Sequence, residues 1–363
     1  MRIGVPKETK AEEYRVGLTP ASVAELTAAG HDVLVEEGAG TAVDFSDSDY
    51  HRAGAQLVDV DSAFSADLVV KVKEPSLQEC ARLSSGQTLF TYLHLAAAPE
   101  QTQALMASGC TAIAYETVED SAGRLPLLTP MSEVAGRMSI QVGAAALQKS
   151  AGGRGVLLGG VPGVSPGKVV ILGGGMAGAN AAQMACGLLA DVTILDKSQD
   201  RLRELSKGFA GRARVLMAST ENVATAVRAA DLVVGAVLVP GAAAPRLIDY
   251  RLLAEMNPGA VLVDISIDQG GCFESSKPTT HANPTYVEEG IVHYCVTNMP
   301  GGVARTSTEA LNNATLPYVK KLAAMGLDKA FQADSGFEKG LNVHAGHLRH
   351  RAVAESLGLR LAA

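Results

Sequence analysis

Residues 168–196 read KVVILGGGMAGANAAQMACGLLADVTILD, and this segment is the most informative part of the sequence. A β-forming run meets Gly173, Gly175 and Gly178, an alanine-rich helical segment follows, and a second β-forming run ends in Asp196. This is G-x-G-x-x-G between a strand and a helix, with an acid about 20 residues further on, as in a dinucleotide-binding βαβ unit. The flanking strand, helix and acid make the pattern more specific than the glycines alone.

Each glycine has its own physical task in this pattern. Gly173 permits the tight turn, Gly175 lets the backbone approach a pyrophosphate, and Gly178 lets the helix pack close to the strand. The N-terminus of the helix supplies N–H donors and the positive end of a dipole. Asp196 is expected to accept hydrogen bonds from a ribose diol and to repel a 2′-phosphate, which favours NAD over NADP. Lys197 beside it weakens this preference.

The composition is typical of a globular α/β protein. The 363 residues are 47% hydrophobic and 19% charged, which is enough chain for two domains. A net charge of −7 argues against a nucleic-acid partner. The uncharged run 169–190 is long enough for a membrane span, but its glycines, Asn180 and Gln183 argue against one.

The cysteines and the N-terminus point to a reducing compartment. Five scattered cysteines without a CxxC predict neither a disulfide framework nor a zinc site. The chain begins with a strand-like segment, which leaves no room for a signal peptide, so we expect a cytoplasmic protein without a membrane partner. His344, His347 and His350 are spaced three residues apart. On a helix this spacing would place them on progressively different faces, and no cysteine accompanies them. We therefore predict no metal.

Strand-like and helix-like segments alternate along most of the chain, which predicts mainly parallel sheets. The predicted strands are 2–5, 32–36, 56–58, 68–73, 88–94 and 111–115, and then 169–172, 192–195, 213–216, 231–237, 260–267 and 291–297. Segment 20–29 reads as a helix opened by Thr19-Pro20, and 132–149 reads as a long helix capped by Ser132. Segment 150–167 reads as loop, and after Met299–Gly302 we expect helices to the end of the chain.

The predicted fold class is α/β, with two Rossmann-like doubly wound parallel-sheet domains. We expect a discontinuous substrate and catalytic domain, 1–128 plus 307–363, because the C-terminal part is predicted to have no sheet of its own. Residues 129–306 would form the NAD-binding domain. Long helices near 132–149 and 307–324 are expected to bridge the domains, with a ligand cleft between them.

Several polar side chains lie where predicted strands end, at the sheet edge where ligands bind in open parallel sheets. They are Lys73, His94, Asp268 and Asn298, with Arg15 in the loop after the first strand. Each also has a structural interpretation: a solvated lysine, a core histidine, or an aspartate that caps the following turn. Together, two cations, an imidazole and a carboxylate suit hydride transfer on a small carboxylate substrate with proton movement.

The chain resembles the alanine dehydrogenase/pyridine nucleotide transhydrogenase α-subunit family in segments spread nearly end to end. The matching segments are Met1–Glu8, Glu13–Val16, Lys71–Pro75, Thr91–Leu95, Pro130–Arg137, Val263–Gly271 and Asn298–Gly301. Long segments in one order are far more specific than G-x-G-x-x-G alone. The resemblance implies NAD-dependent, reversible oxidative deamination of L-alanine to pyruvate and ammonium, by a homo-oligomer, most often a hexamer.

The resemblance also implies residue roles. Arg15 and Lys73 are expected to bind the substrate carboxylate, and His94 and Asp268 to form the catalytic pair, with the assignment of each proton left open. Met131 and Asn298 are expected at the substrate–nicotinamide junction. On the cofactor side, besides the three glycines, it implies Ser132, Met176, Ala177, Asp196, Arg201, Ser219, Val237, Leu238, Ile265, Ser266, Ile267, Asp268, Asn298 and Met299.

One departure from the family pattern is visible, and two other functions stay open. The family usually has a serine near position 218, where this chain has Ala218-Ser219-Thr220, so the residue on the adenosine side is in doubt. The alternatives are the NAD-binding subunit of a proton-translocating transhydrogenase and a non-catalytic NAD-binding regulator. A regulator would not need the pair of His94 and Asp268. The cations Arg15 and Lys73, together with that pair, fit an enzyme with an amino-acid substrate better than a transhydrogenase subunit.

Overall fold

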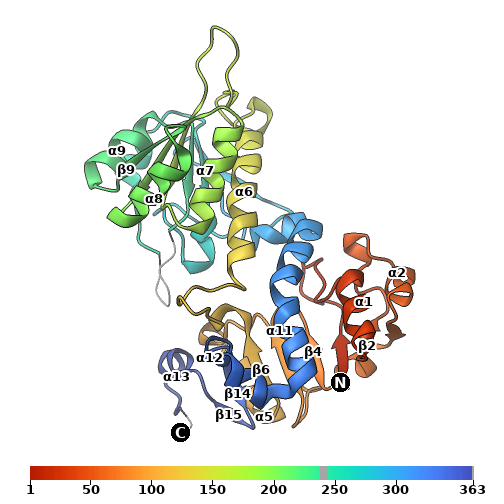
Figure 1. Cartoon of the computed structure of the whole chain (residues 1–363). Coiled ribbons are helices and arrows are strands. Elements are labelled where there is room, and N and C mark those ends of the chain that lie inside the picture. Colours follow the sequence, from red (N-terminus) through yellow and green to blue (C-terminus); the bar gives the residue numbers. More distant parts are fainter. Residues whose placement is uncertain (238–243, 362–363) are drawn as a thin grey trace. The chain divides into compact units, whose positions relative to one another are not determined.

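The computed structural model describes residues 1–237 and 244–361, and the chain divides into two compact units. The first unit comprises Met1–Met131 together with Val303–Ala363, and the second comprises Ser132–Gly302. Each unit has one mostly parallel sheet with helices packed on it (Figure 1). The fold is therefore α/β with two doubly wound sheets, as the alternation of segments predicted.

The sheet of the first unit has the strand order β15-β14-β6-β5-β4-β1-β2-β3. The strands that run parallel are β1 (Arg2–Val5), β2 (Asp32–Glu36), β3 (Gln56–Val58), β4 (Leu68–Val70), β5 (Thr88–Thr91) and β6 (Thr111–Ala114). Their spatial order, 3-2-1-4-5-6, reverses between β1 and β4. Ligands of such sheets bind beyond the carboxyl ends of the strands at this reversal, so the loops after β1 and β4 are where a site is expected.

Helices cover this sheet, and several of them begin at residues whose side chains cap the first turn. Thr19 caps α1 by accepting the backbone N–H of Ser22, and Pro20 stands at the first position, as predicted. The helices of the first unit are α1 (Pro20–Ala28), α2 (Asp47–Arg52), α3 (Val60–Phe64), α4 (Leu77–Cys80), α5 (Pro99–Ser108), α11 (Ala304–Ala333, interrupted at Gly326), α12 (Ser335–Glu338) and α13 (Arg351–Leu357), with the short 3₁₀ helices η1 (Thr41–Val43), η2 (Leu95–Ala97) and η3 (Tyr115–Thr117).

The prediction that the chain stays helical after residue 302 is wrong. Strand β14 (Leu341–His344) pairs antiparallel with β6, and β15 (His347–Leu348) extends the edge of the sheet. The C-terminal part therefore completes the sheet of the first unit. His344 and His347 lie on these strands and His350 precedes α13, so the three histidines do not share a helix.

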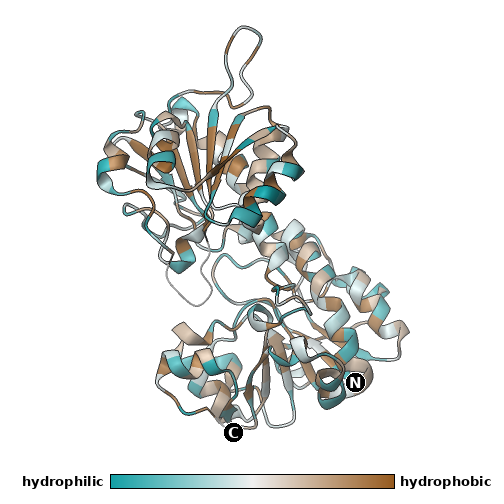
Figure 2. Ribbon diagram, turned by 60° about the vertical axis from the view of Figure 1, so that its left-hand side comes forward, coloured by the Kyte–Doolittle hydropathy of each residue, from teal (hydrophilic) through white to brown (hydrophobic). Residues whose placement is uncertain are grey.

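The sheet of the second unit has the order β12-β13-β11-β10-β7-β8-β9. The parallel strands are β7 (Lys168–Leu172), β8 (Asp191–Asp196), β9 (Ala213–Met217), β10 (Leu232–Gly235), β11 (Val261–Asp264) and β13 (Ile291–Tyr294). They too follow 3-2-1-4-5-6, with the reversal between β7 and β10. Figure 2 shows these strands as hydrophobic, with hydrophilic residues concentrated on the surrounding helices, as burial on both faces requires. The sequence prediction missed β12 (Thr285–Glu288), which pairs antiparallel with β13.

The helices of the second unit surround the glycine-rich turn. They are α7 (Met176–Gly187), α8 (Gln199–Phe209), α9 (Thr220–Ala229) and α10 (Tyr250–Ala254), with the 3₁₀ helices η4 (Lys149–Ala151), η5 (Ile265–Gln269) and η6 (Met299–Val303). Helix α6 (Thr129–Ala146) crosses the boundary between the units in the chain. It begins three residues before Ser132, so the predicted cap is wrong: Ser132 lies in the first helical turn.

The strands that carry candidate residues are shorter than predicted. The strand predicted as 68–73 ends at Val70, the one predicted as 88–94 ends at Thr91, and the one predicted as 260–267 ends at Asp264. The chain turns soon after each of them, into η2 after β5 and into η5 after β11. The candidate side chains therefore lie on short turns beyond the strands.

Candidate active site

Arg15 in the first unit is held by a carboxylate that the sequence analysis missed. Glu13 accepts from Arg15 Nε at 2.7 Å and from Nη2 at 2.6 Å, a bidentate pair with both side chains buried. Burial disfavours the charged forms of both groups, but their mutual bonds prevail: the pKa of Arg15 is raised and that of Glu13 is lowered. The guanidinium is therefore fixed in place and charged. Nη1 also lies 3.0 Å from Sδ of Met131, so two predicted substrate residues meet here.

The lysines after β4 have different surroundings. Lys71 is fully buried between Glu8 and Glu79, at 3.3 and 3.0 Å, so it is a structural ion-pair residue. Glu8 also accepts the backbone N–H of Val72 at 2.7 Å and thereby holds the turn that leads to Lys73. Burial, followed by the charge of Arg15, lowers the pKa of Lys73. The charge of Arg15 is thus felt at Lys73.

His94 is presented to solvent on a constrained turn. Its side chain is 53% exposed, which excludes a core histidine. The backbone has φ of 50°, a left-handed conformation that non-glycine residues adopt at a cost. Glu116 accepts the N–H of His94 at 2.6 Å and that of Leu93 at 3.2 Å, and lies 3.9 Å from Nδ1. The imidazole stacks on Tyr92, with ring centroids 5.9 Å apart. These contacts fix a solvent-accessible titratable group.

The glycine-rich turn of the second unit has the geometry expected for a nucleotide phosphate. Gly173 has φ of 95°, and a Cβ on Gly178 would meet the carbonyl oxygen of Gly173 at 1.8 Å, so the helix can pack this closely only with glycine. A Cβ on Gly175 would meet nothing within 4 Å, which leaves open space before the start of α7. Met176 and Ala177 lie in the first turn of that helix, whose unpaired N–H groups are suited to bind an anion.

Asp196 and Arg201 bind the two backbone polar groups of Gly174 in this turn. Oδ2 of Asp196 accepts the N–H of Gly174 at 2.7 Å, while Nε of Arg201 donates to the Gly174 carbonyl at 2.6 Å. The other oxygen of Asp196 accepts from the N–H of Ser198 at 2.8 Å. A carboxylate has about four lone-pair sites, so this one retains acceptor capacity for a ribose diol. Both residues therefore shape the turn.

A second group of predicted cofactor residues gathers after β10 and β11. Ser266 donates its hydroxyl to the carbonyl oxygen of Val237 at 2.7 Å and so ties η5 to the end of β10. Asp268, on the same turn, is exposed, and it is Asp264 that caps η5. Leu238 lies outside the described residues.

The remaining predicted residues are more dispersed. Asn298 has a left-handed φ of 57°, as His94 has, and its carbonyl oxygen lies 3.2 Å from Nε2 of His281. Met299 beside it is buried. Ser219 caps α9 by accepting the N–H of Asn222 at 3.1 Å, so its hydroxyl already has a structural role.

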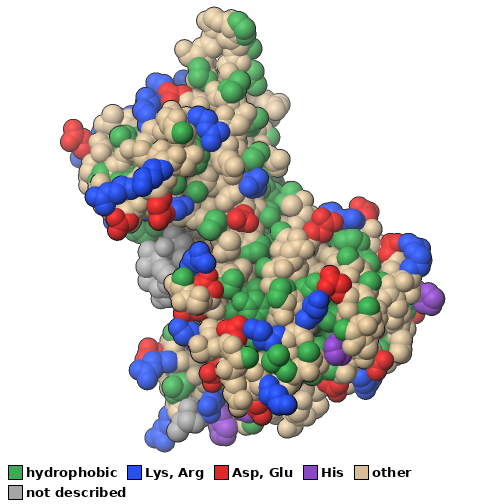
Figure 3. All heavy atoms as spheres, viewed as in Figure 1, with side chains coloured by type: hydrophobic (Ala, Val, Ile, Leu, Met, Phe, Trp, Pro, Cys, Tyr) green, Lys and Arg blue, Asp and Glu red, His purple; other side chains and the backbone are tan. Residues whose placement is uncertain are grey.

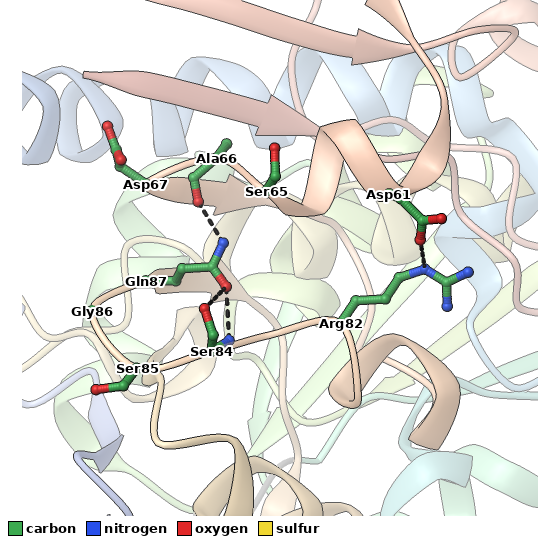
Figure 4. Close-up of a pocket in the computed structure, with 9 residues that line it drawn as sticks. All are labelled: Asp61, Ser65, Ala66, Asp67, Arg82, Ser84, Ser85, Gly86 and Gln87. Atoms are coloured by element: carbon green, nitrogen blue, oxygen red, sulfur yellow. Dashed lines mark hydrogen bonds and ion pairs between the residues drawn. The ribbon is translucent and has the colours of Figure 1, made fainter.

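A surface pocket of about 520 Å³ lies at the other edge of the first sheet (Figure 4). It is lined by Ser65–Asp67, which precede β4, and by Ser84–Gln87, which precede β5. Its polar groups are paired: Gln87 bonds the carbonyl of Ala66, and Arg82 pairs with Asp61 at 2.8 Å. This pocket is at the amino ends of the strands, away from Arg15 and Lys73, so it is not the candidate active site.

Within the described ranges, no three His, Cys, Asp or Glu side chains are arranged to hold a metal ion. No described helix has the length and apolar character to cross a membrane. On the surface in view, acidic and basic side chains are interspersed on each unit (Figure 3). Surface pairs such as Arg203–Asp200, at 2.7 Å, account for part of this mixture.

Known proteins resemble the chain over nearly its full length. The alanine dehydrogenase of Halomonas elongata is 58% identical over 361 residues, which cover 99% of this chain and 97% of that protein. The alanine dehydrogenase of Mycolicibacterium smegmatis is 55% identical with the same coverage. A solved L-alanine dehydrogenase structure has a TM-score of 0.96 at 55% identity and covers 99% of both chains.

The family models agree with these relatives. The model described as alanine dehydrogenase/PNT, N-terminal domain, matches residues 4–135, and its C-terminal counterpart matches residues 139–351. A solved transhydrogenase from Sinorhizobium meliloti, with a TM-score of 0.86 at 24% identity, covers 96% of this chain and 100% of its own, and shares the fold. The chain therefore belongs to the alanine dehydrogenase/PNT family.

Proposed function

We propose that this protein is an NAD-dependent alanine dehydrogenase that converts L-alanine, NAD⁺ and water reversibly to pyruvate, ammonium, NADH and a proton. One observation carries the proposal: 54–58% identity to proteins named alanine dehydrogenase, over nearly the whole of both chains. Identity of this extent covers both units of the chain. The residues of each unit fit a different part of this reaction.

The second unit is suited to hold NAD. The open space at Gly175 and the first turn of α7 can take the pyrophosphate, and Asp196 can bind the ribose diol. NAD, when bound, supplies the acceptor for the hydride that leaves Cα of alanine. Val237, Ser266 and the exposed Asp268 are the further residues that we assign to this side of the reaction.

The first unit is suited to bind the amino acid. Arg15, kept charged by Glu13, and Lys73 beside it attract the substrate carboxylate and orient Cα–H. We assign Met131, in contact with Arg15, to the same subsite, and Asn298 of the second unit to the reacting end of the substrate. The pairing of Glu13 with Arg15 makes the guanidinium a preorganised group, which reduces the ordering cost of substrate binding.

The reaction also moves protons, and we assign this task to His94 and Asp268. A proton must leave the substrate ammonium before hydride departs, and water must then be activated to attack the resulting iminium carbon. Imidazole titrates near neutral pH and suits both transfers. His94 exposes its imidazole while its backbone is fixed by Glu116, which is what a proton-transfer group requires.

The alternative is the NAD-binding subunit of a transhydrogenase, which has a related fold. We prefer the dehydrogenase because the relatives that carry this name are more than twice as similar in sequence. Following the family, we also propose a cytoplasmic homo-oligomer, a hexamer, with L-alanine, pyruvate and ammonium as its partners. Light scattering tests this, and a monomer at the assay concentration would contradict it.

An assay of NADH formation tests the proposed activity. Initial rates are measured at alkaline pH with NAD and L-alanine, and with D-alanine, L-serine and glycine as comparison substrates. We expect L-alanine to give the highest kcat/KM, and pyruvate with ammonium to reverse the reaction. Binding of NAD without NADH formation from L-alanine would overturn the proposal, and hydride transfer between nucleotides alone would favour the transhydrogenase.

A further inference from the structure

A fully buried carboxylate lies at the base of the turn that carries Asp268. Asp264, the last residue of β11, has none of its surface exposed. Its Oδ1 accepts the N–H of Ser266 at 3.0 Å. Its Oδ2 accepts the N–H of Cys272 at 2.8 Å and the hydroxyl of Ser276 at 2.5 Å. One side chain therefore bonds both ends of the segment that contains Asp268.

The segment that contains Asp268 packs tightly against the Asp264 carboxylate. Gly271 has φ of 81°, and a Cβ there would lie 2.7 Å from Oδ2 of Asp264 and 2.7 Å from Cβ of Ser276. Burial raises the pKa of Asp264, and the hydrogen bonds from Ser276, Cys272 and Ser266 oppose this shift. A buried carboxylate is costly unless donors surround it, so the arrangement stabilises one conformation of the turn.

The contacts divide between the two ends of the turn. At the start, Ser266 is tied twice, through its N–H to Asp264 and through its hydroxyl to Val237. At the far end, beyond Asp268, Cys272 and Ser276 donate to Oδ2, and backbone bonds such as that from the N–H of Ala244 to the carbonyl oxygen of Gln269, at 3.0 Å, add to them. Loss of the Ser276 bond should therefore loosen the turn after Asp268 while the tie between Ser266 and Val237 remains.

We infer that Asp264 is a positioning residue that holds Asp268 in its catalytic place through the bonds from Cys272 and Ser276. This inference rests on the proposed function. Asp264 is fully buried, so it acts through the turn and does not itself meet substrate. Misplacement of a reacting group by about 1 Å can cost as much as 100-fold in rate, so small shifts of the turn matter.

A pair of neighbouring serines provides a matched test. Ser276 donates to Asp264, whereas the buried Ser275 bonds Nε2 of His293 at 2.7 Å. Both substitutions, Ser276→Ala and Ser275→Ala, remove one hydroxyl and one hydrogen bond from the same part of the chain. The measurements are kcat, KM for L-alanine, NADH affinity by fluorescence and the melting temperature, with kinetics taken well below melting.

We expect Ser276→Ala to lower kcat about tenfold while NADH affinity stays at the wild-type value. Ser275→Ala should lower the melting temperature, because Nε2 of the buried His293 loses its partner, and leave kcat unchanged. Asp264→Asn, where it folds, should lower kcat further than Ser276→Ala. Equal kcat in the two serine variants, whether reduced or unchanged, would overturn the inference.

The wild-type assay separates this inference from the function on which it rests. If the wild-type protein binds NADH but does not produce NADH from NAD and L-alanine, the proposed function is refuted. The positioning role of Asp264 is then refuted as well. Active wild-type protein with indistinguishable serine variants would refute the positioning role alone. A Ser276→Ala variant that loses NADH affinity with unchanged kcat would also contradict the inference, because the cofactor contacts would then depend on this bond.

Discussion

Glu116 accepts the backbone N–H of His94 at 2.6 Å, and this bond fixes the turn on which the imidazole stands. Glu116 lies in η3, directly after β6, and also accepts the N–H of Leu93. The N–H groups of Leu93 and His94, which lie beyond the end of β5, thereby have an acceptor. The same bonds stabilise the left-handed backbone conformation of His94. The Glu116 carboxylate also lies 3.9 Å from Nδ1 of His94, so Glu116 orients the imidazole ring as well as the backbone.

Glu116→Gln should impair turnover more than binding. The amide keeps one acceptor oxygen and loses the other, so the turn and the ring of His94 lose part of their support. We expect kcat to fall about tenfold or more, with NADH affinity unchanged. The control is Glu119→Gln, which removes a pair with Lys339 at 2.5 Å and should leave kcat unchanged. Equal kinetics in the two variants would refute the role given to Glu116.

The glycine-rich turn could be predicted because its requirements are local. Gly173 needs a positive φ and Gly178 permits a close helix, and both follow from a short pattern between a strand and a helix. The strand alternation likewise predicted both parallel sheets. The rule that the carboxyl ends of parallel strands meet at one sheet edge also predicts Arg15, Lys73 and His94 as site residues, and the structure places all three on turns beyond strands.

The supporting carboxylates could not be predicted, because their partners are backbone groups that only the fold brings near. Glu116 bonds an N–H 22 residues away. Asp264 looked like an ordinary strand residue, and Glu13 had only its closeness to Arg15 as a signal. Strand β14 pairs with β6, which lies more than 200 positions earlier, and nothing in its four residues indicates that distant partner.

Glu13→Gln should weaken both substrate binding and the fold. The guanidinium of Arg15 loses a charged partner in a buried site, which we expect to lower the free energy of unfolding by about 1–3 kcal/mol at neutral pH. KM for L-alanine and for pyruvate should rise. Chemical denaturation and steady-state kinetics measure both effects. A wild-type KM in the variant would show that Glu13 does not prepare Arg15 for substrate.

This difference in stability should depend on pH in one direction. Arg15 lowers the pKa of Glu13 below its ordinary value of 4.5 despite burial, so the carboxylate stabilises the fold fully above that value. The stabilisation is lost as the pH falls through the lowered pKa. The difference in unfolding free energy between wild type and Glu13→Gln should therefore be constant near neutral pH and become smaller in acid. The exposed Glu37→Gln is the control, and a difference that grows in acid would contradict the pairing.

Asp196→Asn should relax the preference for NAD. The amide oxygen can still accept the N–H of Gly174, so the turn keeps its shape, but the negative charge that repels a 2′-phosphate is gone. We expect the ratio of kcat/KM for NAD over NADP to fall about tenfold or more. Asp196→Ala should in addition weaken NAD binding, since the turn loses its acceptor. An unchanged ratio in Asp196→Asn would show that this residue does not select the cofactor.

The most direct test of the account is turnover of L-alanine in His94→Asn. Asparagine tolerates the left-handed backbone of this position and does not titrate near neutral pH, and the side chain is half exposed, so the fold should be retained. The account predicts a fall in kcat of about 10²–10⁴-fold, with NADH affinity and melting temperature near those of the wild type. Near-normal kcat in the folded variant would contradict it.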